Sequence, residues 1–327
     1  MAILVCGGAG YIGSHAVVEL LARGEEVVVI DNLQKGHVGA LTEGATFYDG
    51  DLRDEPFLDL VFTENNIDAV MHFAADSLVG ESVQKPLQYY DNNVGGGITL
   101  LKAMNKHGIK NIVFSSTAAV YGEPKEIPIV ETAETAPTNP YGETKLAVEK
   151  MLKWSEQAYG IQYVVLRYFN VAGAHPNGII GEDHNPETHL IPIILEAALG
   201  KRDEIAIFGD DYDTEDGTCI RDYIHVIDLV AAHILAIEKL RSTGKSGTYN
   251  LGNGNGYSVN EVVEVARKVT GKEIRAAVAP RRAGDPARLV ASSAKAKKEL
   301  GWNPQYESLE SMIKSAWNWF QKHPNGY

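Results

Sequence analysis

The chain has 327 residues, of which 44% are hydrophobic and 22% are charged, and it carries a formal net charge of −13 at pH 7. This length and composition fit one large or two medium-sized globular domains. The negative charge argues against nucleic acid or an anionic membrane as a partner, because both bind basic surfaces.

The N-terminal residues show no basic segment or cleavage site of the kind that marks a signal peptide, and no apolar segment is long enough to span a bilayer. We therefore expect a cytoplasmic protein. Of the two cysteines, Cys6 lies inside an apolar run, so we expect a buried free thiol rather than a disulfide with Cys219.

A dinucleotide-binding motif opens the chain. The apolar segment Ala2–Cys6 predicts a buried strand, and a helix is predicted to run to about Arg23. The turn between them satisfies both G-x-G-x-x-G and G-x-x-G-x-x-G through Gly7, Gly8, Gly10 and Gly13. Glycines in this context let a pyrophosphate approach the backbone at the helix N-terminus.

An acidic residue indicates which dinucleotide is bound. A second strand is predicted over residues 26–30 and is followed directly by Asp31. A carboxylate about 20 residues after the glycines accepts hydrogen bonds from the ribose hydroxyls of NAD and repels the additional phosphate of NADP. The strand, the glycines, the helix, the second strand and its terminal acid together predict an NAD site.

The alternation of strands and helices continues along the chain. Strands are predicted at residues 45–48, 69–73, 111–114 and 163–166, and the longest helices at 86–107 and 141–159. This alternation predicts an α/β protein with a Rossmann-type, doubly wound parallel sheet covered on both faces. Ligands bind beyond the carboxyl ends of such strands, where the glycines, Asp31, Asp51, Phe73, residues 115–117 and Asn170 all fall.

The composition changes after Asn170, and a second, smaller α/β domain is expected there. We predict an NAD-binding domain over residues 1–172 and a substrate domain over 173–327, with a segment near 220–240 packing back on the first domain. Residues 173–192 are rich in glycine, proline and histidine and are interpreted as a loop.

Further elements are expected within this second part. Strands are predicted at Ile205–Phe208 and Ile220–His225, and helices at 225–240, 259–269 and 308–321. Ser258 and Glu261 form a capping box before the second of these helices, and Trp317 and Trp319 are expected to pack in the core. The acidic loop 210–216 is interpreted as a solvated turn, with metal binding as the less favoured alternative, and no residues are assigned as metal ligands.

Tyr141 and Lys145 form the candidate catalytic pair. They lie four residues apart at the start of a predicted helix, so their side chains share one face. To act as a base near neutrality, tyrosine needs its pKa lowered by roughly three units, about 4 kcal/mol, and an adjacent lysine cation favours the phenolate. The Thr117 hydroxyl would share the proton or hold a substrate oxygen. Alone, the pair is more typical of an exposed helix surface, and the NAD motif is what favours catalysis.

Segments along the whole chain resemble the extended short-chain dehydrogenase/reductase family and, within it, the nucleotide-sugar 4-epimerases. They include GGAGYIGSH, FSSTAAVYG, NPYGETK, LRYFN, DGTCIRDYIH and PRRAGDP. The resemblance implies an enzyme that inverts carbon 4 of a UDP-hexose through a 4-keto intermediate, with NAD consumed and regenerated in each turnover. It implies that Tyr141 takes the proton of the 4-hydroxyl, that Lys145 lowers the Tyr141 pKa and holds the nicotinamide ribose, and that Thr117 contacts the 4-oxygen.

The resemblance also implies two sets of binding residues. NAD would be bound by Gly7, Gly10, Tyr11, Ile12, Gly13, Asp31, Asn32, Asp51, Leu52, Phe73, Ala74, Asn92, Tyr141, Lys145 and Phe169. The nucleotide sugar would be bound by Thr117, Asn170, His189, Ala206, Phe208, Arg221, Arg282, Asp285 and Leu289. Two arginines on one diphosphate satisfy charge complementarity, although a surface ion pair is the alternative interpretation of Arg221 and Arg282.

Three positions depart from the family pattern. Asp76 and Ser77 stand where some epimerases place a lysine that contacts NAD, so NAD retention would be weaker. His189 stands where an asparagine often contacts the substrate. Leu289 replaces a tyrosine found in glucose-restricted members, which implies tolerance of UDP-N-acetylhexosamines.

Alternatives remain open at this point. A dehydratase or decarboxylase of the same fold would carry an acid after the catalytic hydroxyl, where this chain has Ala118 and Ala119. An epimerase acting on another nucleotide sugar, such as UDP-glucuronate, is less well excluded. A non-catalytic NAD sensor would not need Tyr141 or Lys145. The resemblance further implies a homodimer through a four-helix bundle of helices 86–107 and 141–159, which are equally readable as layers covering the sheet.

Overall fold

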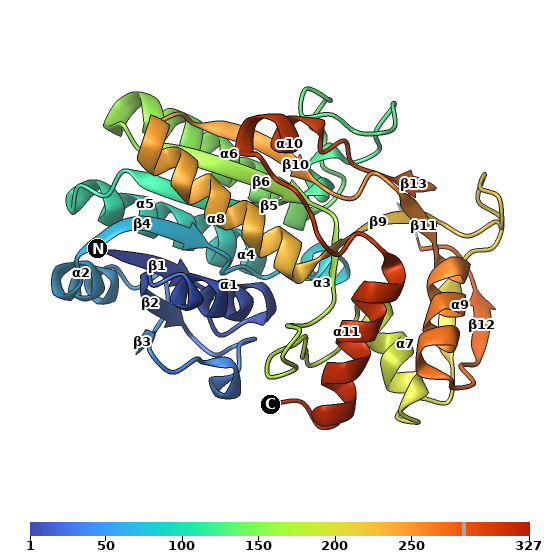
Figure 1. Ribbon diagram of the computed structural model, residues 1–327. Helices are drawn as coiled ribbons and strands as arrows, with labels where there is room; N and C mark the ends of the chain where they lie inside the picture. The colour runs from blue at the N-terminus through green and yellow to red at the C-terminus, as the bar shows by residue number, and fades with distance from the viewer. Residues whose placement is uncertain (283–285) are drawn as a thin grey trace.

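The computed structural model of the protein describes residues 1–282 and 286–327. Its central sheet consists of β1 (Ala2–Cys6), β2 (Glu26–Asp31), β3 (Thr46–Asp49), β4 (Ile67–His72), β5 (Asn111–Thr117), β6 (Gln162–Tyr168) and β10 (Gly247–Leu251). These seven strands pair in parallel in the spatial order β10-β6-β5-β4-β1-β2-β3 (Figure 1). The order reverses between β1 and β4, as in doubly wound dinucleotide-binding folds. The predicted fold class is therefore confirmed.

Helices cover both faces of this sheet. One face carries α1 (Tyr11–Ala22) and α8 (Val226–Thr243), and the other carries α2 (Glu55–Glu64), α5 (Gly96–Lys106) and α6 (Pro140–Tyr159) (Figure 1). Within β1, Ile3 and Val5 pack with the first layer, and Leu4 and Cys6 pack with the second. Because both faces are buried, the strand is apolar at every position rather than at alternate ones.

On the face of the sheet that carries α6, a helical run connects β4 to β5. It contains α3 (Val79–Gln84), α4 (Pro86–Tyr89), a π-helical segment (Tyr90–Gly95) and α5. The predicted helix over 86–107 is thus present, with a π-helical turn in its first half. Short 3-10 turns lie at Val38–Ala40 and Ala118–Tyr121.

A second part of the molecule packs around its own core. It contains α7 (Leu190–Ala198), α9 (Val259–Thr270) and α11 (Leu309–Lys322), which bury one apolar cluster. Its strands are β7 (Asn170–Ala172), β8 (Ile205–Phe208), β9 (Ile220–His225), β11 (Gly256–Ser258), β12 (Ala276–Ala279) and β13 (Arg288–Leu289). β9 pairs with β7, β11 and β13, and β8 pairs with β12.

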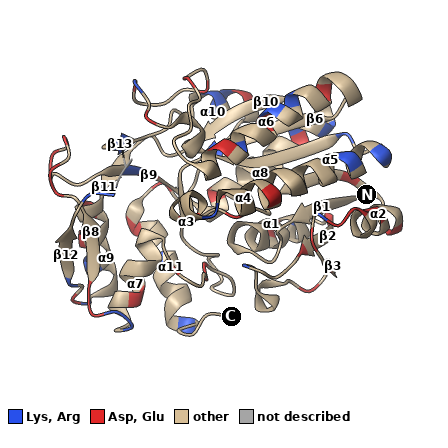
Figure 2. Cartoon of the chain, turned by 180° about the vertical axis from the view of Figure 1, so that it is seen from behind, with Lys and Arg blue, Asp and Glu red and all other residues tan. Residues whose placement is uncertain are grey.

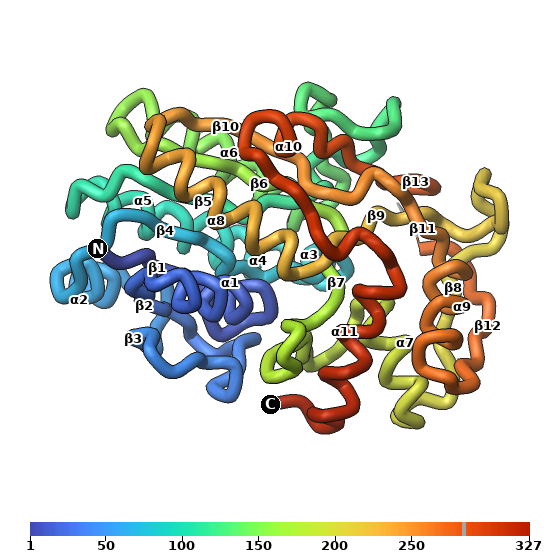
Figure 3. The backbone as a smooth tube through the Cα atoms, viewed as in Figure 1, coloured from blue at the N-terminus to red at the C-terminus, as the bar shows by residue number. Residues whose placement is uncertain are grey.

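The chain passes between the two parts more than once. After β9 it returns through α8 to β10 at the edge of the large sheet, and later α10 (Ala294–Leu300) packs on α8 before the chain ends at α11 (Figure 3). Basic and acidic residues are interspersed along the outer helices and loops (Figure 2). Within the described residues, no helix has the length and apolar character needed to cross a membrane.

Several local predictions are confirmed. The Ser258/Glu261 capping box is formed, Trp317 and Trp319 are buried, and Cys6 is a buried free thiol. The interpretation of residues 173–192 as loop is wrong at its end, because α7 begins at Leu190. Pro192 lies in the first turn of that helix, where its missing N–H costs no hydrogen bond.

Candidate active site

The residues of the candidate catalytic pair lie in the first two turns of α6. The helix begins at Pro140, and the side chain of Asn139 caps it by accepting a hydrogen bond from the backbone N–H of Gly142 at 2.9 Å. One turn apart, the Lys145 ammonium lies 6.0 Å from the centre of the Tyr141 ring. The local sequence thus places both side chains on one face, as predicted.

The end of β5 meets this face. Thr117 forms a hydrogen bond with the Tyr141 hydroxyl, and Lys145 Nζ donates to the backbone carbonyl of Ser115 at 3.0 Å. β5 extends through all three hydroxyl residues, 115–117, rather than ending before them. The structure therefore brings Tyr141, Lys145 and Thr117 together at the carboxyl edge of the sheet.

Burial disfavours the charged forms of both catalytic candidates. It raises the pKa of Tyr141 to about 12, against the opposing hydrogen bond with Thr117. It lowers the pKa of Lys145 to about 7, while the Glu149 carboxylate acts in the opposite direction. Lowering of the Tyr141 pKa by Lys145 therefore stays a prediction, because burial sets the direction of the Tyr141 shift in this structure.

A buried polar network behind Lys145 was missed by the sequence analysis. Glu149, one helical turn beyond Lys145, accepts hydrogen bonds from the Ser116 hydroxyl and from Nε of Arg167 at 3.0 Å. Arg167 Nη1 also donates to the Tyr121 hydroxyl at 2.9 Å. The spacing of Glu149 four residues after Lys145 was the available signal, because such residues share a helix face.

A pocket at the carboxyl ends of β1, β2 and β4 unites most of the predicted NAD contacts. Its lining includes the predicted residues Gly7, Gly10, Asp31, Asn32, Asp51, Leu52, Phe73, Ala74 and Asn92. It also includes Ile30, Gln34, Lys35, Gly36, Gly50, Ala75 and Asp76, which were not predicted as contacts. Among the described residues, the other predicted NAD contacts lie outside this lining: Tyr11, Ile12, Gly13, Tyr141, Lys145 and Phe169.

The pocket fits a dinucleotide on steric grounds. Gly7 has φ +81°, and a Cβ there would lie 2.7 Å from the backbone nitrogen of Ala74. A Cβ on Gly13 would collide with the carbonyl oxygen of Gly7. The motif glycines therefore allow the strand, the turn and the helix to approach closely and leave the N-terminus of α1 open to a pyrophosphate.

Asp31 completes this fit at the end of β2. Its carboxylate accepts hydrogen bonds from the backbone N–H groups of Ala9 at 3.0 Å and Leu33 at 2.9 Å. Burial raises its pKa, and these two hydrogen bonds oppose the shift. An acid held here by the glycine turn suits the ribose hydroxyls of NAD.

Asn93 joins the pocket wall to α6, and sequence analysis did not identify it. The buried side chain accepts from the backbone N–H of Asp76 at 2.8 Å and donates to the Asp76 carbonyl and the Thr144 hydroxyl, both at 3.0 Å. It lies in the π-helical segment beside Asn92. π-Helical segments often occur at functional sites. This one is visible only in the folded backbone, so no local signal in the sequence pointed to Asn93.

The predicted nucleotide-sugar residues that lie on strands are distributed over five of them: Thr117 on β5, Asn170 on β7, Ala206 and Phe208 on β8, Arg221 on β9 and Leu289 on β13. Arg221 and Leu289 are register partners on β9 and β13. Arg221 Nη1 donates to the carbonyls of Ile220 and Pro286, both at 2.9 Å. The two parallel strands therefore present an arginine and a leucine at one position of the small sheet.

A second arginine stands beside β8. The Arg282 guanidinium lies 4.0 Å from the centre of the Phe208 ring, and Ala206 is two residues before Phe208, on the same side of the strand. Asp285, the remaining predicted diphosphate contact, lies outside the described residues.

A buried carboxylate supports the strand that carries Arg221. Asp222 accepts hydrogen bonds from the backbone N–H groups of Asn253, Gly254 and Ala291 at 2.9–3.1 Å. The carbonyl of Asp222 in turn accepts from the Asn170 amide at 3.1 Å. Burial raises the pKa of the Asp222 carboxyl to about 6, against these backbone hydrogen bonds. Asp222 was not identified from the sequence, because its role depends on three distant backbone segments.

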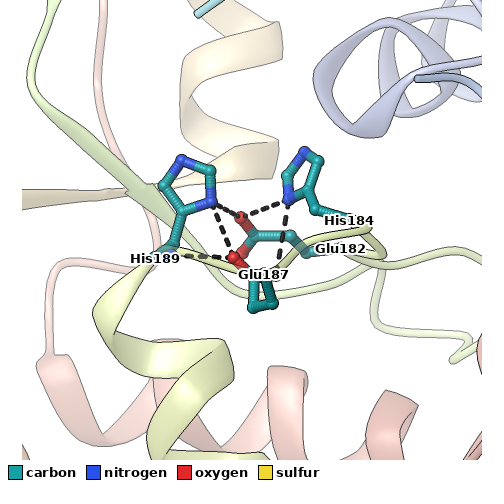
Figure 4. A group of neighbouring side chains, drawn as sticks. All are labelled: Glu182, His184, Glu187 and His189. Atoms are coloured by element: carbon teal, nitrogen blue, oxygen red, sulfur yellow. Dashed lines mark hydrogen bonds and ion pairs between the residues drawn. The ribbon is translucent and has the colours of Figure 1, made fainter. Parts of the chain in front are cut away.

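His189, which is predicted to contact the substrate, lies beside two glutamates and a second histidine. It precedes the first residue of α7, and its Nδ1 atom lies 3.1 Å from Oε1 of Glu182 and 3.0 Å from Oε1 of Glu187. His184 contacts the same two carboxylates. We call these four residues, Glu182, His184, Glu187 and His189, the Glu/His cluster (Figure 4).

Comparisons with known proteins agree with this geometry. The model of the NAD dependent epimerase/dehydratase family matches residues 3–252. UDP-glucose 4-epimerase of Halalkalibacterium halodurans is 66% identical over 327 residues, covering 100% of this chain and 98% of that protein. A crystal structure of a UDP-glucose 4-epimerase superposes with a TM-score of 0.98 at 64% identity, covering 100% and 99% of the two chains. The Bifidobacterium longum UDP-glucose 4-epimerase in complex with NAD+ and UDP gives a TM-score of 0.94 at 45% identity, covering both chains fully (100%).

Proposed function

The chain belongs to the NAD-dependent epimerase/dehydratase family, and from this premise we propose that it interconverts UDP-glucose and UDP-galactose by inverting carbon 4. The observation that carries the proposal is the contact of Tyr141 with Thr117 at the sheet edge where the NAD pocket lies. Lys145 follows Tyr141 by one turn of the same helix. The protein is an enzyme, and NAD is its cofactor.

The chain's own residues supply the proton handling. NAD, when bound, would supply a reversible hydride acceptor, so that hydride taken from carbon 4 could return to the opposite face of the sugar. Tyr141 takes the proton of the 4-hydroxyl, which leaves a 4-keto sugar, and later gives the proton back to the same oxygen. Thr117 holds that oxygen, and Lys145, fixed by the Ser115 carbonyl, places its cation beside the phenol. Hydride and proton both return, so the reaction is an isomerisation with no net redox change.

The diphosphate of the nucleotide sugar is the proposed ligand of Arg221 and Arg282. Guanidinium groups bind phosphate oxygens through paired N–H donors, and two of them offset the charge of one diphosphate within an acidic protein. Asn170, His189, Ala206, Phe208 and Leu289, together with Asp285, complete the proposed substrate set. Because Leu289 is smaller than tyrosine, the proposal includes some turnover of UDP-N-acetylhexosamines.

The chemistry of the neighbouring residues disfavours the rival reactions. A dehydratase or decarboxylase of this fold needs an acid after the hydroxyl, and Ala118 and Ala119, which follow Thr117 in a 3-10 turn, cannot transfer a proton. An epimerase for another nucleotide sugar is the second candidate, and the sugar assay below separates it from the first.

Exposed apolar side chains support a homodimer as part of the proposal. Leu87 is 82% exposed and Trp154 68% exposed, and exposed apolar side chains also occur at Val83, Tyr90 and Ile98. All five lie on the helical run from α3 to α5 or on α6. Such a group of apolar residues marks an interface, and a two-fold pairing of these helices would form a four-helix bundle. A cytoplasmic location is also proposed, because the buried Cys6 thiol is not part of a disulfide.

The test is purified protein incubated with UDP-galactose without added NAD, with UDP-glucose as the measured product. Product formation supports both the reaction and a retained cofactor. Activity that needs added NAD would mean weak retention, as the residues Asp76 and Ser77 suggest. Tyr141→Phe should keep NAD and sugar binding but lose about 10²–10⁴-fold in turnover, whereas Tyr159→Phe at the exposed end of α6 should not. If neither UDP-galactose nor UDP-glucose is turned over when NAD is added, the proposed substrate is wrong and another nucleotide sugar becomes the candidate.

A further inference from the structure

The Glu/His cluster lies in the segment between β7 and α7. The side chains of Glu182 and Glu187 are only 6% and 4% exposed, and those of His184 and His189 are 24% and 44% exposed. Figure 4 shows the two imidazole rings on one side of the two carboxylates, with Nδ1 of each ring directed at the carboxylate oxygens. Two buried carboxylates with oxygen atoms within 4.8 Å of each other need a positive charge beside them, because each is costly to bury unpaired.

The separations within the cluster match those between ligands of one metal ion. His184 Nδ1 lies 3.3 Å from Glu182 Oε1 and 3.4 Å from Glu187 Oε2. His189 Nδ1 lies 3.1 Å and 3.0 Å from Oε1 of the same two residues. Ligand atoms that surround zinc tetrahedrally at bond lengths of about 2.0–2.1 Å are themselves about 3.3 Å apart. One ligand atom from each of the four residues also falls within 4.8 Å of all the others.

Hydrogen bonding alone does not account for His184. Its Nδ1 atom is fully buried and ion-pairs with two carboxylate oxygens within 3.4 Å, but within the described residues none of its contacts has good hydrogen-bond geometry. A buried imidazole nitrogen without a hydrogen bond is unusual in a folded protein. A nitrogen lone pair directed at a point between carboxylates is, by contrast, the arrangement of a metal ligand.

We propose that Glu182, His184, Glu187 and His189 bind one divalent metal ion, with zinc as the ion that fits best. Two imidazole nitrogens and two carboxylate oxygens complete a four-coordinate shell, and two carboxylates neutralise the ion. A shell filled by four protein ligands is typical of structural zinc sites, whereas catalytic zinc keeps an open position. The proposal departs from the sequence analysis, which assigned no metal ligands, because the signal E-x-H-x-x-E-x-H lies within a segment interpreted only as loop.

The ion would fix this segment against the NAD-binding glycine turn. The Tyr11 ring packs edge-on against His184 with ring centres 6.4 Å apart, and the Tyr11 hydroxyl donates to the Gly173 carbonyl at 2.6 Å. His189 directly precedes α7. Metal at Nδ1 leaves Nε2 of each imidazole as an N–H donor, and Figure 4 shows both Nε2 atoms directed away from the carboxylates. His189 therefore keeps a donor for the substrate while its other nitrogen binds the ion.

The competing arrangement is a metal-free ion-pair cluster. Burial opposes protonation of the two rings, but Glu182 and Glu187 raise the pKa of His184 to about 9 and of His189 to about 10. Two imidazolium groups would then neutralise the two carboxylates. The two arrangements differ in metal content, so a direct measurement separates them.

The test uses the purified full chain, treated with chelator, loaded with zinc and passed through gel filtration before elemental analysis. The expected result is one zinc per chain, together with the intense visible absorption of tetrahedral Co²⁺ when cobalt replaces zinc. The double variant His184→Asn/His189→Asn should lose at least tenfold in zinc affinity. His107→Asn is the matched control, because His107 contacts a single carboxylate, Asp59, at 2.6 Å, and it should keep one zinc.

Glu187→Gln keeps the proposal testable if the double variant does not fold. It preserves side-chain volume and removes one charged ligand, so tenfold weaker zinc binding is again expected. Zinc below one equivalent in the wild-type protein, or equal zinc binding by the cluster variants and His107→Asn, would overturn the proposal in favour of the metal-free cluster.

Discussion

The Glu149 carboxylate and the Arg167 guanidinium form a buried ion pair directly behind Lys145. Both side chains are 8% exposed, and Arg167 contacts both carboxylate oxygens through Nε and Nη2. Arg167 lies on β6 and Glu149 on α6, so the pair fixes the catalytic helix to the sheet. Glu149 also acts on Lys145 by opposing the lowering of its pKa.

Removal of the Glu149 charge should therefore destabilise the protein strongly. Glu149→Gln leaves Arg167 buried without a counter-charge, and breaking a buried pair in this way costs about 3–5 kcal/mol. Urea unfolding measures the change. The matched control is Glu134→Gln, which removes the partner of Lys125 from a pair exposed by 72% and 86% and should cost less than about 1 kcal/mol. Similar losses in both variants would contradict the structural role given to Glu149.

The contrast between Glu149 and Tyr141 explains which features the sequence could predict. Tyr141, Lys145 and the motif glycines were found because their signals are local: a four-residue helical spacing, and glycines between a strand and a helix. Asn93 and Glu149 act through residues distant in the chain, such as Thr144 and Arg167. Their roles depend on burial and side-chain geometry that only the packed sheet and helices create.

The same reasoning applies to the fold. β1, β2, β4, β5 and β6 of the central sheet were predicted because buried parallel strands are continuously apolar, whereas β3 is a less buried edge strand. β10 was missed, since GTYNL contains glycine and asparagine and has no continuous apolar run. Its pairing with β6 is a tertiary event without a local signal. The short strands β7, β11 and β13 have at most three residues each and were missed for the same reason.

Gly13→Ala should impair NAD binding and stability together. The new methyl group would collide with the Gly7 carbonyl oxygen, so the glycine turn must move away from α1. We expect a loss of about 1–3 kcal/mol in unfolding free energy and at least tenfold weaker NAD binding. NAD content after gel filtration and the thermal unfolding midpoint measure both effects.

Gly80→Ala is the matched control for this substitution. Gly80 lies in α3, and a Cβ added there would meet no atom within 4 Å outside the neighbouring backbone of its own helix. Alanine favours a helix over glycine, so stability should rise by roughly 0.5–1 kcal/mol with NAD binding unchanged. Retention of full NAD binding in Gly13→Ala would mean that the turn is more tolerant than its close contacts indicate.

Buried histidines should make the protein less stable below neutral pH. Burial, with a smaller effect of the Lys145 charge, lowers the pKa of His72 to about 3, and burial lowers that of His233 to about 4. In the unfolded chain each has a pKa of about 6.5. As the pH falls below this value, the unfolded chain binds protons that the folded protein does not, so stability falls.

His72→Leu isolates one of these contributions. The Nδ1 atom of His72 is buried and has no hydrogen-bond partner within the described residues, so leucine removes a titrating group without breaking a bond there. Between pH 6.5 and 5, the variant should lose up to about 1.4 kcal/mol less stability per pH unit than the wild-type protein. Urea unfolding across this range measures the slopes. Asp222, whose raised pKa acts in the opposite direction, contributes equally to both proteins. Identical slopes would mean that His72 is protonated in the folded state.

Leu87→Glu should separate the proposed homodimer into monomers. Leu87 is 82% exposed on α4, among the apolar side chains of the helical run and α6, so a two-fold interface would bury it near its symmetry mate. Two like charges in a desolvated interface are unfavourable, and the association constant should fall by more than tenfold. Analytical ultracentrifugation of the wild-type protein and the variant measures this change. Val38→Glu is the matched control, because Val38 is 65% exposed on a 3-10 turn next to β2, outside these helices. A monomeric wild-type protein would contradict the homodimer. A dimer that tolerates Leu87→Glu as well as it tolerates Val38→Glu would show that the exposed apolar residues of α4 and α6 are not its interface.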